Sequence, residues 1–341
     1  MIVIGAGMAG LLAARLFRQS GRELTIYEAQ DRLPNNHSAV LRFRGTAISD
    51  ATGIPFRRVR MIKAAHGHAG SAVADALAYS RKCTGRLFSD RSLPLMPVAE
   101  DRYIAPPDFI PQLAKGTNFL FGCDFFESEF WEVRAAHVPI ISTIPMPALM
   151  RALGYPGAPT FSSVPSIHVR SRVADCDAYV SVYDADPESA VARASITGDE
   201  VIVEAPMPGA SWEDLRRIVS DADAIARLLG RGAALLGLRD ADLSADTRAD
   251  AALYGKILPI PDDMRKDFIY WATEQHNIYS LGRYATWRPA LMCDDLAQDV
   301  RLIGKWVAAG RFAARVHAAR PLAQRLPPPI GQGDQRALAE G

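Results

Sequence analysis

The stretch that decides the fold is the N-terminus, Met1-Ile2-Val3-Ile4-Gly5-Ala6-Gly7-Met8-Ala9-Gly10-Leu11-Leu12. Its apolar, β-branched start predicts a short buried parallel strand, and the residues after the glycines predict a helix that ends near Gly21. Between the two, Gly5 permits a tight turn, Gly7 lets the backbone approach a pyrophosphate, and Gly10 lets the helix pack closely on the strand. The helix N-terminus then offers free N–H groups to phosphate oxygens.

A second strand is predicted from Leu24 to Tyr27, and Glu28 lies at its end. This position is close to the offset of ~20 residues at which an acidic side chain accepts hydrogen bonds from a ribose diol. The negative charge also disfavours the 2′-phosphate of NADP. The pattern therefore predicts a dinucleotide-binding site. Its expected members are Gly5, Gly7, Met8, Ala9, Gly10, Glu28 and, in the loop beyond, Arg32.

The segment Tyr279–Arg288 reads as a strand that ends at Gly-Arg and continues into an aromatic loop, followed by a helix. This order is typical of flavoproteins whose C-terminal part closes over the cofactor. The dipole of the following helix can stabilise the negative charge that a flavin gains on reduction. We expect Tyr284 to contact the substrate. The expected cofactor contacts are Gly282, Arg283, Trp287, Asp294, Asp295 and Leu296.

The rest of the chain separates into two kinds of pattern. Short alternating runs between about 164 and 205 predict an antiparallel sheet, whereas 138–144 predicts another buried strand. Residues 31–60 read as rich in loops, and 85–118 as a proline-rich connection with short strands at most. Helices are expected at 67–83, 211–230, 262–275 and 294–317.

The predicted fold class is therefore α/β, with a Rossmann-type FAD-binding domain and an inserted α+β substrate domain that contains an antiparallel sheet. The FAD-binding domain is expected to be discontinuous, with the substrate domain filling the gaps. The expected boundaries are 1–60, 115–150 and 255–320 for the FAD-binding domain, 61–114 and 151–254 for the substrate domain, and 321–341 for a flexible tail.

Composition excludes several other classes. The chain of 341 residues has a net charge of +1, so it lacks the global basic field of non-specific nucleic-acid binders. No stretch reaches the ~18 apolar residues that span a membrane. The four scattered cysteines, and His66 with His68, show no metal-ligand spacing. We expect a cytoplasmic protein with reduced thiols, no membrane contact and no metal.

Three segments resemble the FAD-dependent amine oxidase and UDP-galactopyranose mutase type of flavoprotein. They are the N-terminal glycine turn, Ile141-Ser142-Thr143-Ile144-Pro145 with Leu149, and Gly282-Arg283. The stretch Asn36–Arg44, together with Tyr279–Arg288, also resembles small bacteriophage flavoproteins, some of which lie among enzymes that hypermodify thymine in phage DNA. The family's usual Gly-Gly doublet after the second strand is missing, so the path of that loop stays open.

The resemblance implies FAD as cofactor and hydride transfer to flavin N5 from a C–H next to an amine. Since no second dinucleotide motif is present, electrons are expected to come from the organic substrate. The implied substrate is a small amine or an amino-acid-modified thymine nucleotide or DNA, in the host cytoplasm if the chain is phage-encoded. A mutase or lyase reaction, and a flavin-binding protein without catalysis, stay open as alternatives.

Several residues are candidates for the chemistry. His37 is placed to lie over the flavin, and the resemblance implies that Lys256 holds a water at N5. Arg42, with Arg44, is a candidate for binding a carboxylate or phosphate. For each, an ordinary role also fits: a loop histidine, a lysine at a strand edge, exposed strand arginines. Local arginines would have to meet DNA phosphates, and the candidates are Arg57, Arg58 and Arg60.

Overall fold

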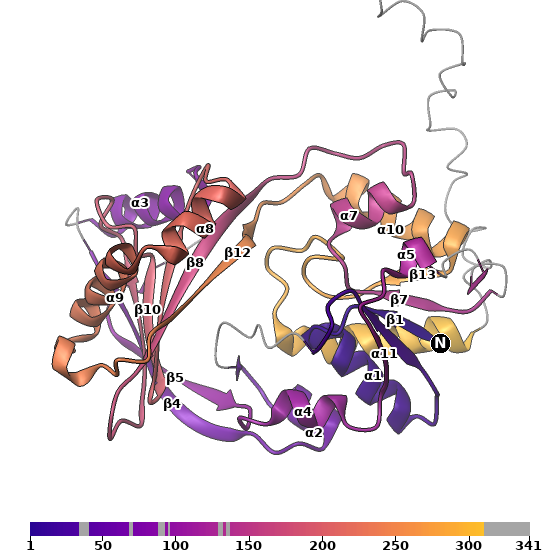
Figure 1. The fold of residues 1–341 in the computed structure, drawn as a ribbon, viewed down its shortest axis with the longest axis horizontal. Coiled ribbons are helices and arrows are strands. Elements are labelled where there is room, and N and C mark those ends of the chain that lie inside the picture. Colours follow the sequence, from indigo (N-terminus) through magenta and orange to yellow (C-terminus); the bar gives the residue numbers. More distant parts are fainter. Residues whose placement is uncertain are drawn as a thin grey trace, which may run out of the picture.

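A computed structural model describes residues 1–33, 41–67, 71–87, 93–94, 96–128, 132–133 and 137–309. Two sheets organise the described chain (Figure 1). One is five-stranded and parallel, in the order β13-β7-β1-β2-β6; the other is eight-stranded, in the order β12-β8-β11-β10-β9-β4-β5-β3. The larger sheet is antiparallel except where β4 pairs with β9. This confirms the predicted combination of a Rossmann-type sheet with a mostly antiparallel one.

The parallel sheet is built from segments far apart in the sequence. Its strands are β1 (Ile2–Ile4), β2 (Thr25–Glu28), β6 (Asn118–Phe121), β7 (Ile140–Ser142) and β13 (Ile278–Ser280). Helices α1 (Met8–Gln19) and α11 (Leu296–Ala308) pack in the hydrophobic core on one face, whereas α7 (Met146–Ala152) and α10 (Asp262–His276) pack on the other. Alternate residues of each strand supply the two cores, because successive side chains point to opposite faces.

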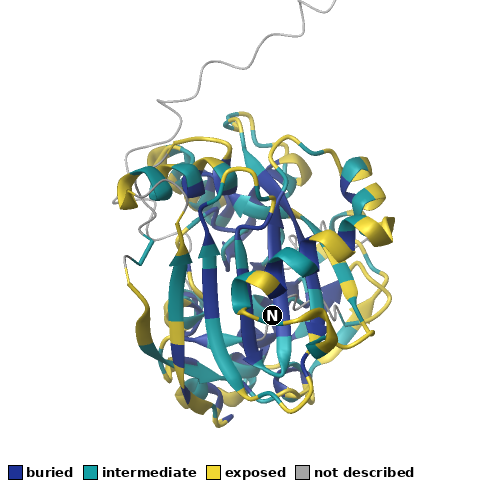
Figure 2. Cartoon of the chain, turned by 90° about the vertical axis from the view of Figure 1, so that its left-hand side faces the viewer, coloured by how far each residue is buried: buried dark blue, intermediate teal, exposed yellow. Residues whose placement is uncertain are grey.

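The larger sheet has one face covered by helices. Its strands are β3 (Arg42–Phe43), β4 (Arg57–His66), β5 (Val98–Ile104), β8 (Ser163–Arg172), β9 (Ala178–Asp184), β10 (Arg193–Gly198), β11 (Glu200–Pro206) and β12 (Arg248–Ile257). Helices α3 (Ala72–Thr84), α8 (Trp212–Ser220) and α9 (Ala222–Leu236) lie on one side, and the parallel sheet lies on the other (Figure 1). Viewed from the helix side, buried residues concentrate along the strands (Figure 2).

Shorter elements join these layers. They are α2 (Ala47–Thr52), α4 (Phe109–Ala114), α5 (Phe125–Ser128), and the 3-10 turns η1 (Asp240–Asp242) and η2 (Cys293–Asp295). Within the described residues, no helix has both the length and the apolar character required to cross a membrane.

Several expected elements are corrected. The long strand β4 begins inside the stretch expected to be loop, and β5 and α4 fill the expected proline-rich connection. The single helix expected over 211–230 is two helices, because the Asp221 carboxylate accepts hydrogen bonds from the N–H groups of Asp223 (3.0 Å) and Ala224 (3.1 Å) and so starts α9. Helix α3 begins at Ala72, and α11 is described only to Ala308.

Candidate functional site

The glycine turn between β1 and α1 has the geometry that its spacing predicts. Gly5 has φ +94°, and a Cβ there would lie 2.4 Å from Thr143 Oγ1. A Cβ on Gly10 would lie 2.0 Å from the carbonyl oxygen of Gly5. In contrast, among the described residues no atom other than those of its chain neighbours lies within 4 Å of the Cβ position of Gly7. Packing within the protein therefore requires the first and third glycines, whereas the second one faces open space.

The same turn leaves the N-terminus of α1 without a side-chain cap. Gly7 is the N-cap residue, and the first turn contains no acidic residue. The first N–H groups of a helix have no partner inside the helix, and they form its positive end. The N–H groups of Met8 and Ala9 thus belong to a helix end suited to an anion.

Glu28 lies at the end of β2, beside this turn, and is only 8% exposed. Its Oε2 accepts a hydrogen bond from Ala6 N–H (2.7 Å), and its Oε1 accepts one from Gln30 N–H (3.0 Å). Each carboxylate oxygen can accept a second bond. Glu28 can therefore brace the turn and bind a diol at the same time. Arg32 is exposed, with its Nε 4.0 Å from Asp31 Oδ1.

The C-terminal segment crosses the N-terminus of α1. Gly282 has φ +97°, and a Cβ there would lie 3.0 Å from the Cβ of Ala9. The structure thus brings together the two segments that the sequence assigned to one site. Trp287 follows with φ +46°, a rare conformation for a bulky residue. Burial and a 2.8 Å hydrogen bond from its Nε1 to the Leu258 carbonyl hold it there.

The other residues that were predicted to contact the cofactor have partners within the protein. Asp294 Oδ1 accepts from the N–H groups of Arg44 (2.7 Å) and Gly45 (3.0 Å), which ties the segment after β3 to the start of α11. Asp295 Oδ2 accepts from Met292 N–H (2.9 Å), and Arg283 Nε donates to the Pro289 carbonyl (3.0 Å). Leu296 is buried in the core beside α1. Their contact with a cofactor stays a prediction.

The residues that were predicted to take part in catalysis or in substrate binding have the following positions. His37 lies outside the described residues. Lys256 lies on β12 with its Nζ 3.6 Å from Glu204 Oε2, so its charge is engaged in the larger sheet. Tyr284 packs with Tyr254, with 6.1 Å between ring centroids, and burial raises its pKa above the ordinary tyrosine range. The neighbour of Lys256, Ile257, packs in the same core as Trp287.

Sequence reasoning missed a polar face on the larger sheet, on the side away from α8 and α9. Strand register places its members there, because residues directly opposite each other in paired strands share a face of the sheet. The opposed pairs are Arg193 with Glu204, Glu204 with His168, and Ser181 with Ser195. We define the polar face by these residues: Arg42, Lys63, Glu100, Arg102, His168, Ser181, Arg193, Ser195, Glu204 and Lys256. Period-2 alternation in each strand was the available signal.

Electrostatics on the polar face centre on one buried ion pair. Burial opposes the charge of Glu204, but Arg193 and Lys256 outweigh it and hold the pKa of Glu204 well below its usual range. Burial likewise opposes the charge of Arg193. The attraction of Glu204 is larger than this effect of burial, so the pKa of Arg193 is raised. Burial lowers the pKa of His168, which keeps its imidazole neutral at neutral pH. The face thus combines fixed charges with a neutral histidine.

The arginines of β4 that were expected to bind DNA phosphates have structural partners. Arg57 pairs with Asp177 at 3.1 Å, and Arg58 and Arg60 pair with Asp101 at 2.5 and 3.6 Å. These pairings do not favour the expected role in binding DNA phosphates. Among the residues that the structure describes, no group of three or more His, Cys, Asp or Glu side chains could hold a metal ion; His68 is not among them.

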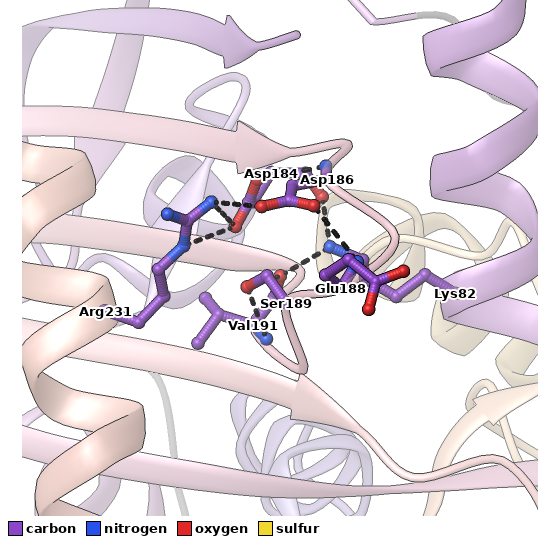
Figure 3. Close-up of polar contacts among 7 residues, drawn as sticks. All are labelled: Lys82, Asp184, Asp186, Glu188, Ser189, Val191 and Arg231. Carbon is purple, nitrogen blue, oxygen red and sulfur yellow. Dashed lines mark hydrogen bonds and ion pairs between the residues drawn. The ribbon is translucent and has the colours of Figure 1, made fainter. Parts of the chain in front are cut away.

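A second charged cluster lies near α3 and α9, at the end of β9 (Figure 3). Arg231 on α9 pairs with Asp184, which is completely buried, at 2.8 Å and with Asp186 at 3.1 Å. Lys82 on α3 donates to the carbonyls of Asp184 (2.8 Å) and Val191 (2.9 Å). The cluster anchors the loop between β9 and β10 to the helices, so we read it as structural.

Comparison with known proteins agrees with this geometry. Residues 3–40 match the model of the NAD(P)-binding Rossmann-like domain. No curated protein sequence matches the chain. A crystal structure of reduced UDP-galactopyranose mutase superimposes with a TM-score of 0.61 at 13% identity, covering 93% of this chain and 97% of the mutase.

Two further solved structures share the fold over nearly their whole length. Glycine oxidase from Geobacillus kaustophilus gives a TM-score of 0.51 at 14% identity, covering 95% of this chain and 96% of that one. A probable FAD-dependent monooxygenase from Pseudomonas aeruginosa gives a TM-score of 0.51 at 13% identity. The superposition covers 95% of this chain and 92% of the monooxygenase. At these identities the likeness establishes the fold, in which both sheets are shared, and nothing finer.

Proposed function

We propose that the chain is an FAD-dependent oxidoreductase whose cofactor binds along the glycine turn. The observation that carries this proposal is the contact of Gly282 with Ala9, because it places the C-terminal segment over an uncapped helix N-terminus. The chain's own groups fit the cofactor. Gly7 leaves room for a pyrophosphate, the N–H groups of Met8 and Ala9 suit its charge, and Glu28 has acceptor capacity for the ribose. The structural neighbours named above support FAD, since one is described as FAD-dependent.

Within this proposal the reaction is oxidation of a C–H bond next to an amine nitrogen. When bound, FAD would supply the hydride acceptor. The task of the chain is to hold the substrate carbon in place and to exclude water, for which the aromatic group of Tyr254, Tyr284 and Trp287 is suited. Lys256 and His37 remain our candidates for handling a water or proton.

The substrate we propose is a small amine. The sequence resemblance to phage flavoproteins suggests one specific case, an amino-acid-decorated thymine in DNA or as a nucleotide. Oxidation of the C–H next to its nitrogen would give an imine, which water would hydrolyse to an aminomethyl base and a released carbonyl compound. A flavin mutase or lyase reaction is the second candidate. The structural neighbour that is described as a UDP-galactopyranose mutase suggests it.

Anaerobic mixing with substrates distinguishes these functions. We expect the oxidised protein to lose its visible flavin absorbance with at least one member of a panel of amines, amino acids and aminoacyl-thymine nucleotides. The reason is that the nitrogen lone pair stabilises the cation that develops as the hydride leaves. Matched alcohols serve as the control panel and should leave the absorbance unchanged. Reduction by dithionite but by no amine would contradict the oxidase proposal and favour the mutase.

A further inference from the structure

Arg42 occupies the junction between the polar face and the C-terminal segment. It is the first residue of β3, at the edge of the larger sheet. Just beyond it, the N–H groups of Arg44 and Gly45 are bound by Asp294 at the start of α11. A group held by Arg42 would therefore lie on the same face of the sheet as Arg102 and Arg193.

Arg42 differs from the other cations of the polar face in its partners. Its Nη1 donates to Ser181 Oγ at 3.3 Å and contacts Met61 Sδ at 3.4 Å. No carboxylate among the described residues forms an ion pair with it, whereas Arg193 pairs with Glu204, and Lys63 pairs with Glu100 at 2.5 Å. A largely buried charge without a directly paired carboxylate is costly. Burial, and then Arg193, lower the pKa of Arg42 to about 10 against the opposing effect of Glu204, which is itself paired with Arg193, so Arg42 stays charged at neutral pH.

The hydroxyl partner of Arg42 adds donor capacity. Ser181 Oγ lies 2.8 Å from Ser195 Oγ, and both serines are at most 2% exposed. Their mutual hydrogen bond uses one of the two hydroxyl hydrogens, which leaves the other for an acceptor. Cations outnumber carboxylates on the polar face, so its field also favours an anion.

We propose that Arg42, with the Ser181–Ser195 pair, binds an oxyanion of the substrate, either a carboxylate or a phosphate. The planar guanidinium group matches such groups, and no carboxylate of the described chain pairs directly with it. This proposal rests on the proposed function, since it assigns the anion to the substrate rather than to the cofactor. It narrows the substrate to an anionic amine, such as an amino acid or a nucleotide-linked amine.

The test is thermal unfolding of the full-length purified chain in chloride, inorganic phosphate or acetate at constant ionic strength. We expect phosphate or acetate to raise the wild-type Tm in a saturable way, and whichever does so identifies the class of oxyanion. Arg42→Met should raise the half-saturating concentration by at least about tenfold. Arg42→Lys should lose part of the response, because lysine keeps the positive charge but lacks the planar guanidinium group. If Arg42→Met does not fold, Arg42→Lys replaces it in the test. Arg60→Met is the matched control, since it removes an exposed cation from β4, and it should respond as wild type.

Three results would overturn the proposal. They are a wild-type Tm that neither anion changes, an equal response in the Arg42 variants, or loss of bound FAD in those variants. The last would assign the anion to the cofactor's pyrophosphate. FAD content is measured on the same samples by absorbance after denaturation. If wild-type protein holds no FAD, the proposed function fails, but the anion titration still reports on Arg42.

Discussion

Gly7→Ala is expected to give a folded protein that no longer retains FAD. Gly7 has φ −68°, which alanine adopts without strain, and its Cβ position meets no protein atom within 4 Å. The new methyl group would occupy the space through which a pyrophosphate approaches the backbone, so it should cost at least the about 1–3 kcal/mol typical of overpacking. Far-UV circular dichroism should match wild type and the Tm should match that of FAD-free wild type, while the flavin absorbance disappears on dialysis.

Gly10→Ala is the matched control for that variant, because it makes the same chemical change three residues further along the turn. Its Cβ would lie 2.0 Å from the Gly5 carbonyl oxygen, which is backbone and cannot move away cheaply. Helix α1 would have to leave the core that it shares with α11. We therefore expect a large drop in Tm or insoluble protein. If Gly7→Ala keeps its FAD, or if both variants unfold alike, the assignment of Gly7 to the cofactor is wrong.

Glu28→Ala is expected to have the next largest effect, on both cofactor affinity and stability. Two charge-assisted hydrogen bonds to a ribose, at about 1.5–3 kcal/mol each, correspond to at least a hundredfold loss of FAD affinity. Because the carboxylate also braces the N–H groups of Ala6 and Gln30, the Tm should fall by several degrees as well.

Equilibrium dialysis and flavin fluorescence measure the affinity of this variant. Glu23→Ala, an exposed position just before the same strand, is the control and should change neither FAD affinity nor Tm. Unchanged flavin retention in Glu28→Ala would show that the carboxylate does not bind the ribose.

The nucleotide-binding turn could be predicted from the sequence because its constraints are local. Gly5, Gly7 and Gly10 act within one turn, and each glycine has a distinct steric environment that its spacing anticipates. The association of Gly282 with the turn was also expected, from the order of strand, loop and helix near the C-terminus.

The larger sheet and its polar face could be predicted only in part. Strands β8 to β11 were expected from their alternating apolar residues, but β4 was hidden because charged residues occupy its exposed positions, as in Arg57-Arg58-Val59-Arg60. The polar face combines residues from strands whose pairing order does not follow the sequence, such as Arg42, Ser181 and Arg193. Periodicity gives the face of each strand, but it does not tell which strands are neighbours.

The central claim is that this chain carries FAD, and the most direct test is to identify what the purified protein releases on denaturation. The account predicts yellow protein that releases FAD, and not FMN, in a ratio near one per chain, because the glycine turn and Glu28 are placed to bind the adenosine half of the cofactor. Colourless protein that cannot be reconstituted with FAD, or protein that binds FMN equally well, would contradict it.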